Sequence, residues 1–213
     1  MTHKSKTDLL VLQTLRVKGF IDTALIAENV SLNDEETLEI LNVFEEKQLA
    51  RYRDGRMSGW MLTPEGRSAG EVLLADEVDS LGIRKEIEEA YRNFLEVNGG
   101  FLTLCTDWQL IPALADSENE SKINEHTDSD YDSIVIQRLV DMDDGAQPIC
   151  SSLAKNLGRF STYSERFTFA LEKVLAGEID WFTKPMIESY HTVWFELHEN
   201  LLSTLGIDRA TES

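Results

Sequence analysis

The chain has 213 residues, of which 42% are hydrophobic and 28% are charged, and its formal net charge is −19 at pH 7. This composition is typical of a folded globular protein and argues against a disordered or fibrous chain. Its apolar stretches are far shorter than the roughly 20 residues that a membrane-spanning helix requires, and its polar first segment lacks the apolar core of a signal peptide. We therefore expect a cytoplasmic protein that does not bind membranes.

The charge is distributed unevenly along the chain. Residues 1–74 contain 9 Lys and Arg against 12 Asp and Glu, which gives −3, whereas residues 75–213 contain 11 against 27, which gives −16. An acidic protein repels a phosphate backbone unless its cations gather on one face. The first part is therefore not excluded from DNA by its charge.

Three short helices are predicted first, over residues 7–17, 22–29 and 34–47, because their apolar residues recur with helical spacing. Asp22 or Thr23 can cap the second helix, and Asn33 or Asp34 can open the third. In the third helix, Leu38, Leu41, Val43 and Phe44 are expected on the buried side, whereas in the second Leu25, Ile26 and Val30 are expected to pack inward.

The pattern then changes to that of a β-hairpin. Two short strands are predicted over residues 49–53 and 56–62, and Asp54-Gly55 between them is a strong turn dipeptide. Thr63-Pro64 is typical of a helix N-cap followed by proline in the first turn, so a fourth helix is expected through residue 74. This order predicts a winged helix-turn-helix with a two-stranded wing.

Residues 7–75 resemble the MarR and PadR-like winged-helix transcriptional regulators. The most specific stretch runs from Arg51-Tyr52-Arg53-Asp54-Gly55-Arg56 into Leu62-Thr63-Pro64-Glu65-Gly66-Arg67. The resemblance implies that the third helix enters the major groove of double-stranded DNA and that the hairpin contacts its backbone or minor groove. The DNA-contacting residues that it implies are Asn33, Thr37, Asn42, Arg51, Arg53 and Arg56.

The third helix departs from that pattern because it carries many carboxylates, namely Asp34, Glu35, Glu36, Glu39 and Glu46. A DNA-reading helix normally presents Arg, Lys, Asn, Gln or Ser to bases and phosphates. The sequence therefore leaves two functions open. One is a DNA-binding transcriptional regulator, and the other is an acidic protein-interaction module with a degenerate winged helix.

Residues 76–213 are predicted to form a separate, all-helical bundle domain that supplies homodimer contacts or a site for an effector. We expect helices over residues 80–98, 102–114, 131–142, 149–176 and 187–205. Gly99-Gly100 is expected to end the first of these, and Gly158 to bend the fourth. No strand is predicted in this part of the chain.

Two sets of polar residues in the second part are candidate binding sites. Arg159, Tyr163 and Arg166 would share one helical face and could hold an anionic ligand, although pairing with some of the acidic residues of this part is the favoured alternative. His126, Asp128, His191 and His198 could contribute to a metal site if the acidic connector folded against the last helix. The alternatives are a solvated acidic loop and histidines at the margin of a core formed by Tyr190, Val193, Trp194, Leu197 and Leu201.

Catalytic motifs are missing from the sequence. There is no Gly-x-Ser-x-Gly, no phosphate-binding Gly-x-x-x-x-Gly-Lys and no dinucleotide fingerprint. Cys105 and Cys150 have no Cys-x-x-Cys spacing and lie in apolar surroundings, which predicts buried thiols. We expect neither an enzyme nor a cofactor.

Overall fold

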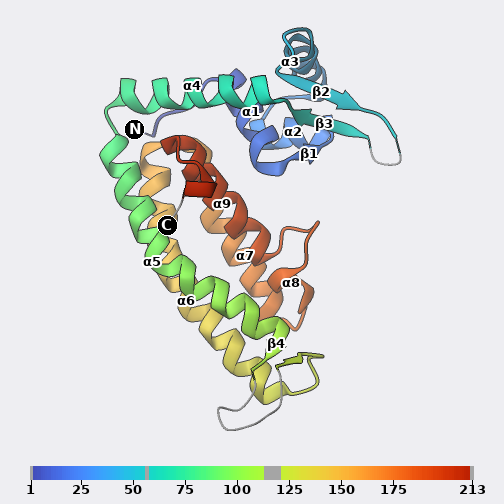
Figure 1. The fold of residues 1–213 in the computed structure, drawn as a ribbon, viewed down its shortest axis with the longest axis vertical. Coiled ribbons are helices and arrows are strands. Elements are labelled where there is room, and N and C mark those ends of the chain that lie inside the picture. Colours follow the sequence, from blue (N-terminus) through green and yellow to red (C-terminus); the bar gives the residue numbers. More distant parts are fainter. Residues whose placement is uncertain (1, 56–57, 113–120, 212–213) are drawn as a thin grey trace. The chain divides into compact units, whose positions relative to one another are not determined.

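The structure, a computed structural model, describes residues 2–55, 58–112 and 121–211, and over these ranges it is mainly helical (Figure 1). The chain forms two compact units. The first unit comprises Met1–Ile87, Asn156–Arg159 and Glu196–Ser213, and the second comprises Glu88–Lys155 and Phe160–Phe195. Within the described ranges, no helix is long and apolar enough to cross a membrane.

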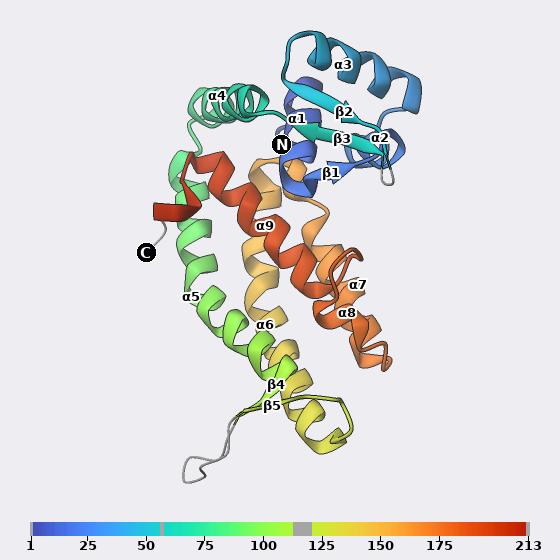
Figure 2. The same ribbon diagram turned by 45° about the vertical axis from the view of Figure 1, so that its right-hand side comes forward.

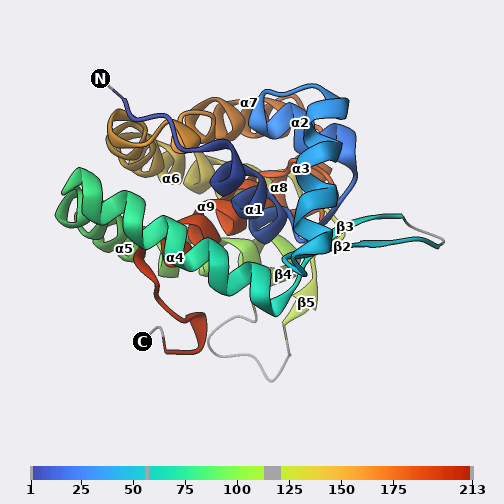
Figure 3. The ribbon, with the colours of Figure 1, turned by 90° about the horizontal axis from the view of Figure 1, so that it is seen from above.

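The first unit begins with three helices, and it continues with a β-hairpin and a fourth helix. The bounds are α1 Thr7–Lys18, β1 Phe20–Ile21, α2 Thr23–Val30, α3 Asp34–Glu46, β2 Ala50–Arg53, β3 Gly59–Leu62 and α4 Pro64–Leu81. The strands form one antiparallel sheet in the order β1-β3-β2, and β2 and β3 run out together from the helices (Figure 3). The hairpin was predicted, whereas β1 is an additional strand.

The helix starts follow local side-chain signals that were predicted from the sequence. The Asp22 carboxylate accepts a hydrogen bond from the Leu25 amide at 2.9 Å, and the Thr63 hydroxyl accepts one from the Gly66 amide at 2.9 Å. Asn33 opens α3 and shares a reciprocal capping box with Glu36. These caps satisfy backbone donors that the first turn of a helix leaves unpaired.

The core of the first unit lies between α1, α2, α3 and the sheet. It is formed by Val11, Leu12, Leu15, Ile21, Ile26, Val30, Leu41, Phe44, Ala50 and Trp60. The predicted burial of Leu25, Leu38 and Val43 is wrong, because these side chains are 48%, 43% and 43% exposed. On α3 the buried side is formed by Leu41 and Phe44 together with Thr37, which places Leu38 on the outer side of the helix.

The start of α4 packs closely on the residue that precedes β2. A Cβ atom at Gly66 would lie 1.8 Å from the Leu49 carbonyl oxygen, so the position has no room for any side chain. The Thr63 hydroxyl also donates to this carbonyl, at 3.0 Å. The Thr-Pro-Glu-Gly stretch therefore begins the helix and fixes it against the hairpin.

The remaining elements are five helices of different lengths, two very short strands and two 3-10 turns within the described residues. Their bounds are α5 Arg84–Gln109, β4 Leu110–Ile111, β5 Lys122–Ile123, α6 Ser129–Asn156, η1 Gly158–Phe160, α7 Tyr163–Leu175, α8 Asp180–Thr183, α9 Tyr190–Leu205 and η2 Arg209–Thr211. In the second unit α5 and α6 run side by side (Figure 2). The antiparallel pair β4-β5 contradicts the all-helical prediction.

Several predicted helix boundaries in this part are wrong. Ser80 does not open a helix, because α4 continues to Leu81 and ends at Gly82, whose φ is 66°. The predicted break between residues 142 and 149 is also missing, since α6 runs through Pro148. Gly158 begins a separate 3-10 turn and does not bend a longer helix.

Helix α5 also continues through Gly99-Gly100, where an end was predicted. Each glycine costs a helix about 1 kcal/mol relative to alanine, but the apolar face extends on both sides of the pair. Phe94 and Phe101 are both 0% exposed, so ending the helix at the glycines would interrupt a continuous buried surface. Packing therefore overrides the local propensity.

The interior of the second unit is rich in aromatic rings. Phe101 and Trp194 are stacked at 4.2 Å between ring centroids, and Phe167 and Tyr190 lie 4.7 Å apart. The prediction that Tyr190, Val193, Trp194, Leu197 and Leu201 are core residues is confirmed, the first three in the second unit and the two leucines in the first. Cys105 and Cys150 are buried as predicted, and burial raises the pKa of each thiol to about 12.

Candidate interaction surfaces

Helix α3 turns a mostly acidic face to the solvent. The residues on this face, which we call the α3 face, are Glu35, Leu38, Glu39, Asn42 and Glu46. Glu35, Glu39, Asn42 and Glu46 follow one another at intervals of three or four residues, and Leu38 lies beside Glu39, so the five residues form one stripe along the helix. The α3 face therefore combines three carboxylates with an amide and a leucine that is 43% exposed.

The three α3 residues with an implied role in DNA binding have different surroundings. Asn33 serves as the helix cap, because its side chain accepts a hydrogen bond from the Glu36 amide at 2.9 Å. Thr37 is 0% exposed, which removes it from any surface that a base could approach. Asn42 is exposed on the α3 face. The side chains that surround Asn42 on this face are mainly hydrogen-bond acceptors and negatively charged.

Strand β2 displays the exposed arginines of the hairpin. Arg51 and Arg53 are exposed, and between them Tyr52 lies against Trp60 with 5.3 Å between the ring centroids. Glu45 accepts a hydrogen bond from the Tyr52 backbone amide at 3.1 Å, so a carboxylate of α3 occupies part of the β2 edge. Arg56, the third predicted phosphate contact, lies outside the described residues.

The predicted turn residues follow β2 directly. The Asp54 carboxylate accepts hydrogen bonds from the Gly55 amide at 2.9 Å and from the Ser58 hydroxyl at 2.8 Å. Asp54 and Gly55 thus lie in the connection between the two paired strands, as predicted, but this connection is longer than the predicted dipeptide, because β3 begins at Gly59 and not at residue 56.

Two cations of α1, Arg16 and Lys18, are held by carboxylates. Arg16 of α1 contacts Glu71 at 2.6 Å and Glu199 at 2.9 Å, and Lys18 contacts Glu196 at 2.9 Å. The Arg16 and Lys18 side chains are only 10% and 17% exposed. An anionic partner would have to displace these carboxylates to reach either cation, which leaves β2 as the more accessible basic position.

Arg159, a predicted ligand-binding residue, is enclosed within the first unit. Its guanidinium group pairs with the Glu77 carboxylate, and it donates to the Ser5 hydroxyl at 3.0 Å and the Thr204 hydroxyl at 3.1 Å. His3 Nε2 lies 3.2 Å from the same Glu77 carboxylate. Arg159 is therefore part of a polar cluster whose members are protein side chains.

Tyr163 and Arg166, the other two members of that predicted site, belong to the second unit. Tyr163 is 3% exposed and forms part of the core. The Arg166 guanidinium lies 5.3 Å from the Tyr163 ring centroid and donates through Nε to Glu188 at 2.8 Å. The arginines are thus paired with acidic residues, which is the alternative that the sequence left open.

His126, a predicted metal ligand, takes part in a small polar cluster beside β5. Its Nδ1 lies 3.1 Å from the Asp132 carboxylate, and its ring lies 4.2 Å from that of Trp108. Asn124 donates to Asp132 at 2.8 Å and to the Trp108 carbonyl at 3.1 Å. The cluster fastens the segment after β5 to α5 and α6.

The remaining predicted metal ligands are not gathered around a cation site. Asp128 caps the start of α6 by accepting from the Tyr131 amide at 3.0 Å. His191 lies over the Phe101 ring, and burial lowers its pKa. His198 is a buried residue of the first unit, whereas His126 and His191 belong to the second. The described part of the chain contains no group of three His, Cys, Asp or Glu arranged to hold a metal ion.

Asp143 is a buried carboxylate that was not predicted from the sequence. It accepts hydrogen bonds from the Tyr190 hydroxyl at 3.0 Å and from the Gln147 amide at 3.1 Å. Burial raises the pKa of Asp143, and these two hydrogen bonds oppose the shift. Burial also raises the pKa of Tyr190 well above its ordinary value. Only the position of Asp143 in the middle of α6, four residues before Gln147, hinted at this in the sequence.

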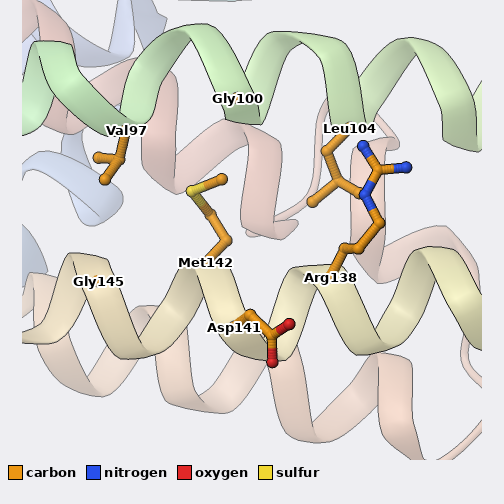
Figure 4. A pocket seen from close by; sticks show the side chains of 7 residues that line it. All are labelled: Val97, Gly100, Leu104, Arg138, Asp141, Met142 and Gly145. Atoms are coloured by element: carbon orange, nitrogen blue, oxygen red, sulfur yellow. The ribbon is translucent and has the colours of Figure 1, made fainter.

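An open groove of about 310 Å³ lies between α5 and α6 (Figure 4). Val97 and Leu104 extend from α5, Met142 extends from α6, and Arg138 and Asp141 lie at the α6 side. A Cβ atom at Gly100 would lie 3.3 Å from the Met142 terminal methyl, which explains why a glycine suits this position. Arg138 contacts Asp107 at 2.7 Å, so its charge is already compensated.

Comparisons of the chain with protein-family models, with curated proteins and with solved structures find no match.

Proposed function

We propose that the first unit is a protein-interaction module of the winged-helix type that binds its partner through the α3 face. The observation that carries this proposal is the composition of that face, where Glu35, Glu39 and Glu46 accompany a Leu38 side chain that is 43% exposed. The order of helices and strands, with a β1-β3-β2 sheet, supports the winged-helix assignment.

Electrostatics favours a protein partner over DNA at this face. Carboxylates repel phosphates, and they can accept hydrogen bonds from few base edges. A protein partner with lysine or arginine beside an apolar side chain would match both the charge and the exposed leucine. Such a partner would also avoid burying unpaired carboxylates, which is costly.

A binding experiment with a defined probe tests this proposal. We expect the full chain to bind a fluorescent amphipathic helical peptide of leucine and lysine, and we expect Glu39→Gln with Glu46→Gln to weaken binding about tenfold. The matched control is Glu28→Gln with Glu65→Gln, which removes the same charge from exposed positions of the first unit. Equal losses in both double variants would mean that the peptide senses only net charge, and the proposal would fail.

A second candidate function is a double-stranded-DNA-binding transcriptional regulator. The observation in its favour is the pair of exposed arginines on β2, Arg51 and Arg53. If these residues contact phosphates, Arg51→Ala with Arg53→Ala should weaken binding to all duplex sequences alike and flatten its salt dependence. An unchanged salt slope in a binding titration would argue against the hairpin as a DNA contact.

A further inference from the structure

The open groove between α5 and α6, which we call the α5–α6 groove, has the size of a small binding site. Its volume is about 310 Å³, and pockets that bind small organic molecules have volumes from about 300 Å³ upward. A water molecule takes up roughly 30 Å³ of the liquid, so the groove has room for about ten non-hydrogen atoms. Its size therefore suits a molecule of one ring with a short side chain.

The walls of the groove are mainly apolar, and they come from both helices. Val97 and Leu104 extend from α5, and Met142 extends from α6 toward the space between them (Figure 4). Methionine adapts to different neighbours because its side chain is unbranched and flexible. A ligand with an apolar body would leave water by entering the groove and would pack against these three side chains.

Two glycines, Gly100 of α5 and Gly145 of α6, keep the groove open. Glycine is less favourable than alanine inside a helix, and contact between the helices does not require it here. A Cβ atom at Gly145 would lie 3.5 Å from Val97, which is an ordinary van der Waals distance. At Gly100 the distance would be 3.3 Å, but the atom met there is the flexible end of Met142. Larger side chains at these positions would take up space in the groove.

The polar groups that line the groove also have partners of their own. Arg138 donates through Nη1 to the Asp107 carboxylate at 2.7 Å, and Asp141 accepts a hydrogen bond from the Gln137 amide at 3.0 Å. A guanidinium group has five N–H donors, and within the described ranges Asp107 is the only acceptor bonded to Arg138. The Arg138 side chain is 43% exposed, so its other donors can reach a ligand in the groove.

These charges determine which kind of ligand fits. An anion would be repelled by Asp107 and Asp141 and by the second unit as a whole, which contains 7 Lys and Arg against 19 Asp and Glu, a net −12. A cation would meet the Arg138 guanidinium beside the groove. A neutral molecule avoids both repulsions, and an oxygen atom on it could accept a hydrogen bond from Arg138.

We propose that the α5–α6 groove binds a small neutral molecule that has an apolar body and one hydrogen-bond acceptor. The apolar body packs against Val97, Leu104 and Met142, and the acceptor receives a hydrogen bond from Arg138. All the lining residues belong to the second unit, so the proposal is independent of the α3 face and of the function proposed for it.

Three probes of similar size and different charge test the class of ligand. Phenethyl alcohol is neutral, phenethylammonium is a cation and phenylacetate is an anion. We expect NMR titration of the full chain to give a dissociation constant of about 1 mM for the alcohol, because a ligand of about ten non-hydrogen atoms gains little affinity in an open site. The dissociation constants of the two ions should be at least about threefold larger. The inference is overturned if either ion binds as tightly as the alcohol, or if the alcohol shows no binding at about 10 mM.

Two matched pairs of variants locate the binding. Gly100→Leu places a side chain in the groove, whereas Gly99→Leu places one where a Cβ atom meets nothing within 4 Å. We expect Gly100→Leu to raise the dissociation constant of the alcohol about tenfold or more, and Gly99→Leu to leave it nearly unchanged. Arg138→Met removes the hydrogen-bond donor and should raise this constant about threefold. Arg92→Met removes the same charge from an exposed position of α5 and should have little effect.

Circular dichroism of each variant shows whether it has folded before its binding is compared. If Gly100→Leu does not fold, Gly100→Ala and Gly99→Ala make the same comparison with a smaller expected difference of about threefold. A folded Gly100 variant that binds the alcohol as well as its Gly99 counterpart does would rule out the groove as the site. If Arg138→Met binds no more weakly than Arg92→Met, the proposed hydrogen bond is wrong. None of these outcomes bears on peptide binding at the α3 face, so the two proposals can fail separately.

Discussion

The two ends of helix α9 are held by different kinds of contact. Its first turns, in the second unit, bury Tyr190 and Trp194 among aromatic rings. Its later turns, in the first unit, bury polar groups, and Asn200 and Ser203 both accept hydrogen bonds from the Gln13 amide of α1, at 2.9 and 2.7 Å. The first turns of α9 therefore pack mainly against aromatic rings, whereas the later turns bury Leu197 and Leu201 together with hydrogen-bonded polar groups.

The difference between these ends shows how each limits substitution. Apolar packing tolerates exchange between side chains of similar volume. A buried polar or charged group depends on partners in exact positions, and removing one partner leaves the other desolvated. The polar end of α9 should therefore fix the position of the helix in the first unit more strictly than the aromatic end fixes its position in the second unit.

The largest expected effect follows from breaking the Arg159 cluster. Arg159→Met would leave the Glu77 carboxylate buried without its guanidinium partner and should lower the free energy of unfolding by about 3–5 kcal/mol. Urea denaturation measures this change. The control is Arg166→Met, which breaks a more exposed pair with Glu188 and should cost about 1 kcal/mol or less.

A double variant distinguishes the buried charge from lost packing. Adding Glu77→Leu to Arg159→Met removes the stranded carboxylate and should restore much of the lost stability. If Arg159→Met lowers the free energy of unfolding no more than Arg166→Met does, the polar end of α9 does not limit substitution more strictly than the aromatic end.

Most of the first unit could be predicted because its signals are local. Asp22, Asn33 and Thr63 mark the starts of helices within three residues of the amides that they cap. The contact between Gln13 and Asn200 joins residues 187 positions apart, and no local pattern indicates it. The sequence thus predicted elements well and predicted their distant polar partners poorly.

Errors in the second unit arose where packing overrides local propensity. Gly99-Gly100 was read as a helix end and a break was predicted between residues 142 and 149, but both positions lie inside long helices whose apolar faces continue on either side. The residues proposed for ligand and metal binding failed to gather for a related reason. Shared spacing along the chain brings side chains together only if one helix contains them, and Arg159 and Tyr163 lie in separate elements.

The aromatic end of α9 also contains a buried polar contact, which is made by Tyr190. Tyr190→Phe keeps the ring in place but removes the hydroxyl that donates to Asp143 at 3.0 Å. We expect the free energy of unfolding to fall by about 1–3 kcal/mol, because a buried acceptor loses a donor. Tyr52→Phe is the control, since that ring is 47% exposed, and a change of similar size there would contradict the interpretation.

Asp143 should also give the second unit a recognisable pH dependence. Because burial raises its pKa above the ordinary value of 3.8, folding favours the protonated form. Its contribution to stability is therefore fully present below pH 3.8 and is lost as the pH rises through the pKa in the folded chain. The difference in unfolding free energy between the unaltered chain and Asp143→Asn should fall over this range by at most about 1.4 kcal/mol per pH unit.

His191, in the same unit, has the opposite effect on the pH dependence of stability, so the two contributions can be separated. Burial lowers the pKa of His191 from 6.5, so its contribution is present above pH 6.5 and is lost as the pH falls through the lowered value. His191→Gln should remove this loss of stability at low pH and leave unchanged the pH dependence of stability that Asp143 causes. If the difference in unfolding free energy between the unaltered chain and Asp143→Asn did not change with pH, burial would not raise the pKa of this carboxylate.

The smallest expected effect has the opposite sign and concerns α3. The Thr37 hydroxyl is buried, and among the described residues it has no hydrogen-bond partner. Thr37→Val keeps the shape of the side chain and removes the unsatisfied hydroxyl, so it should raise the free energy of unfolding by about 1 kcal/mol. Asn42→Val, on the exposed side of the same helix, is the control and should change stability by about 0.5 kcal/mol or less.

If Thr37→Val lowered stability instead, the hydroxyl would have a partner in solution and the orientation assigned to α3 would need revision. A gain would support that orientation and, with it, the assignment of Leu38 and the three glutamates to the side of α3 that a partner can reach.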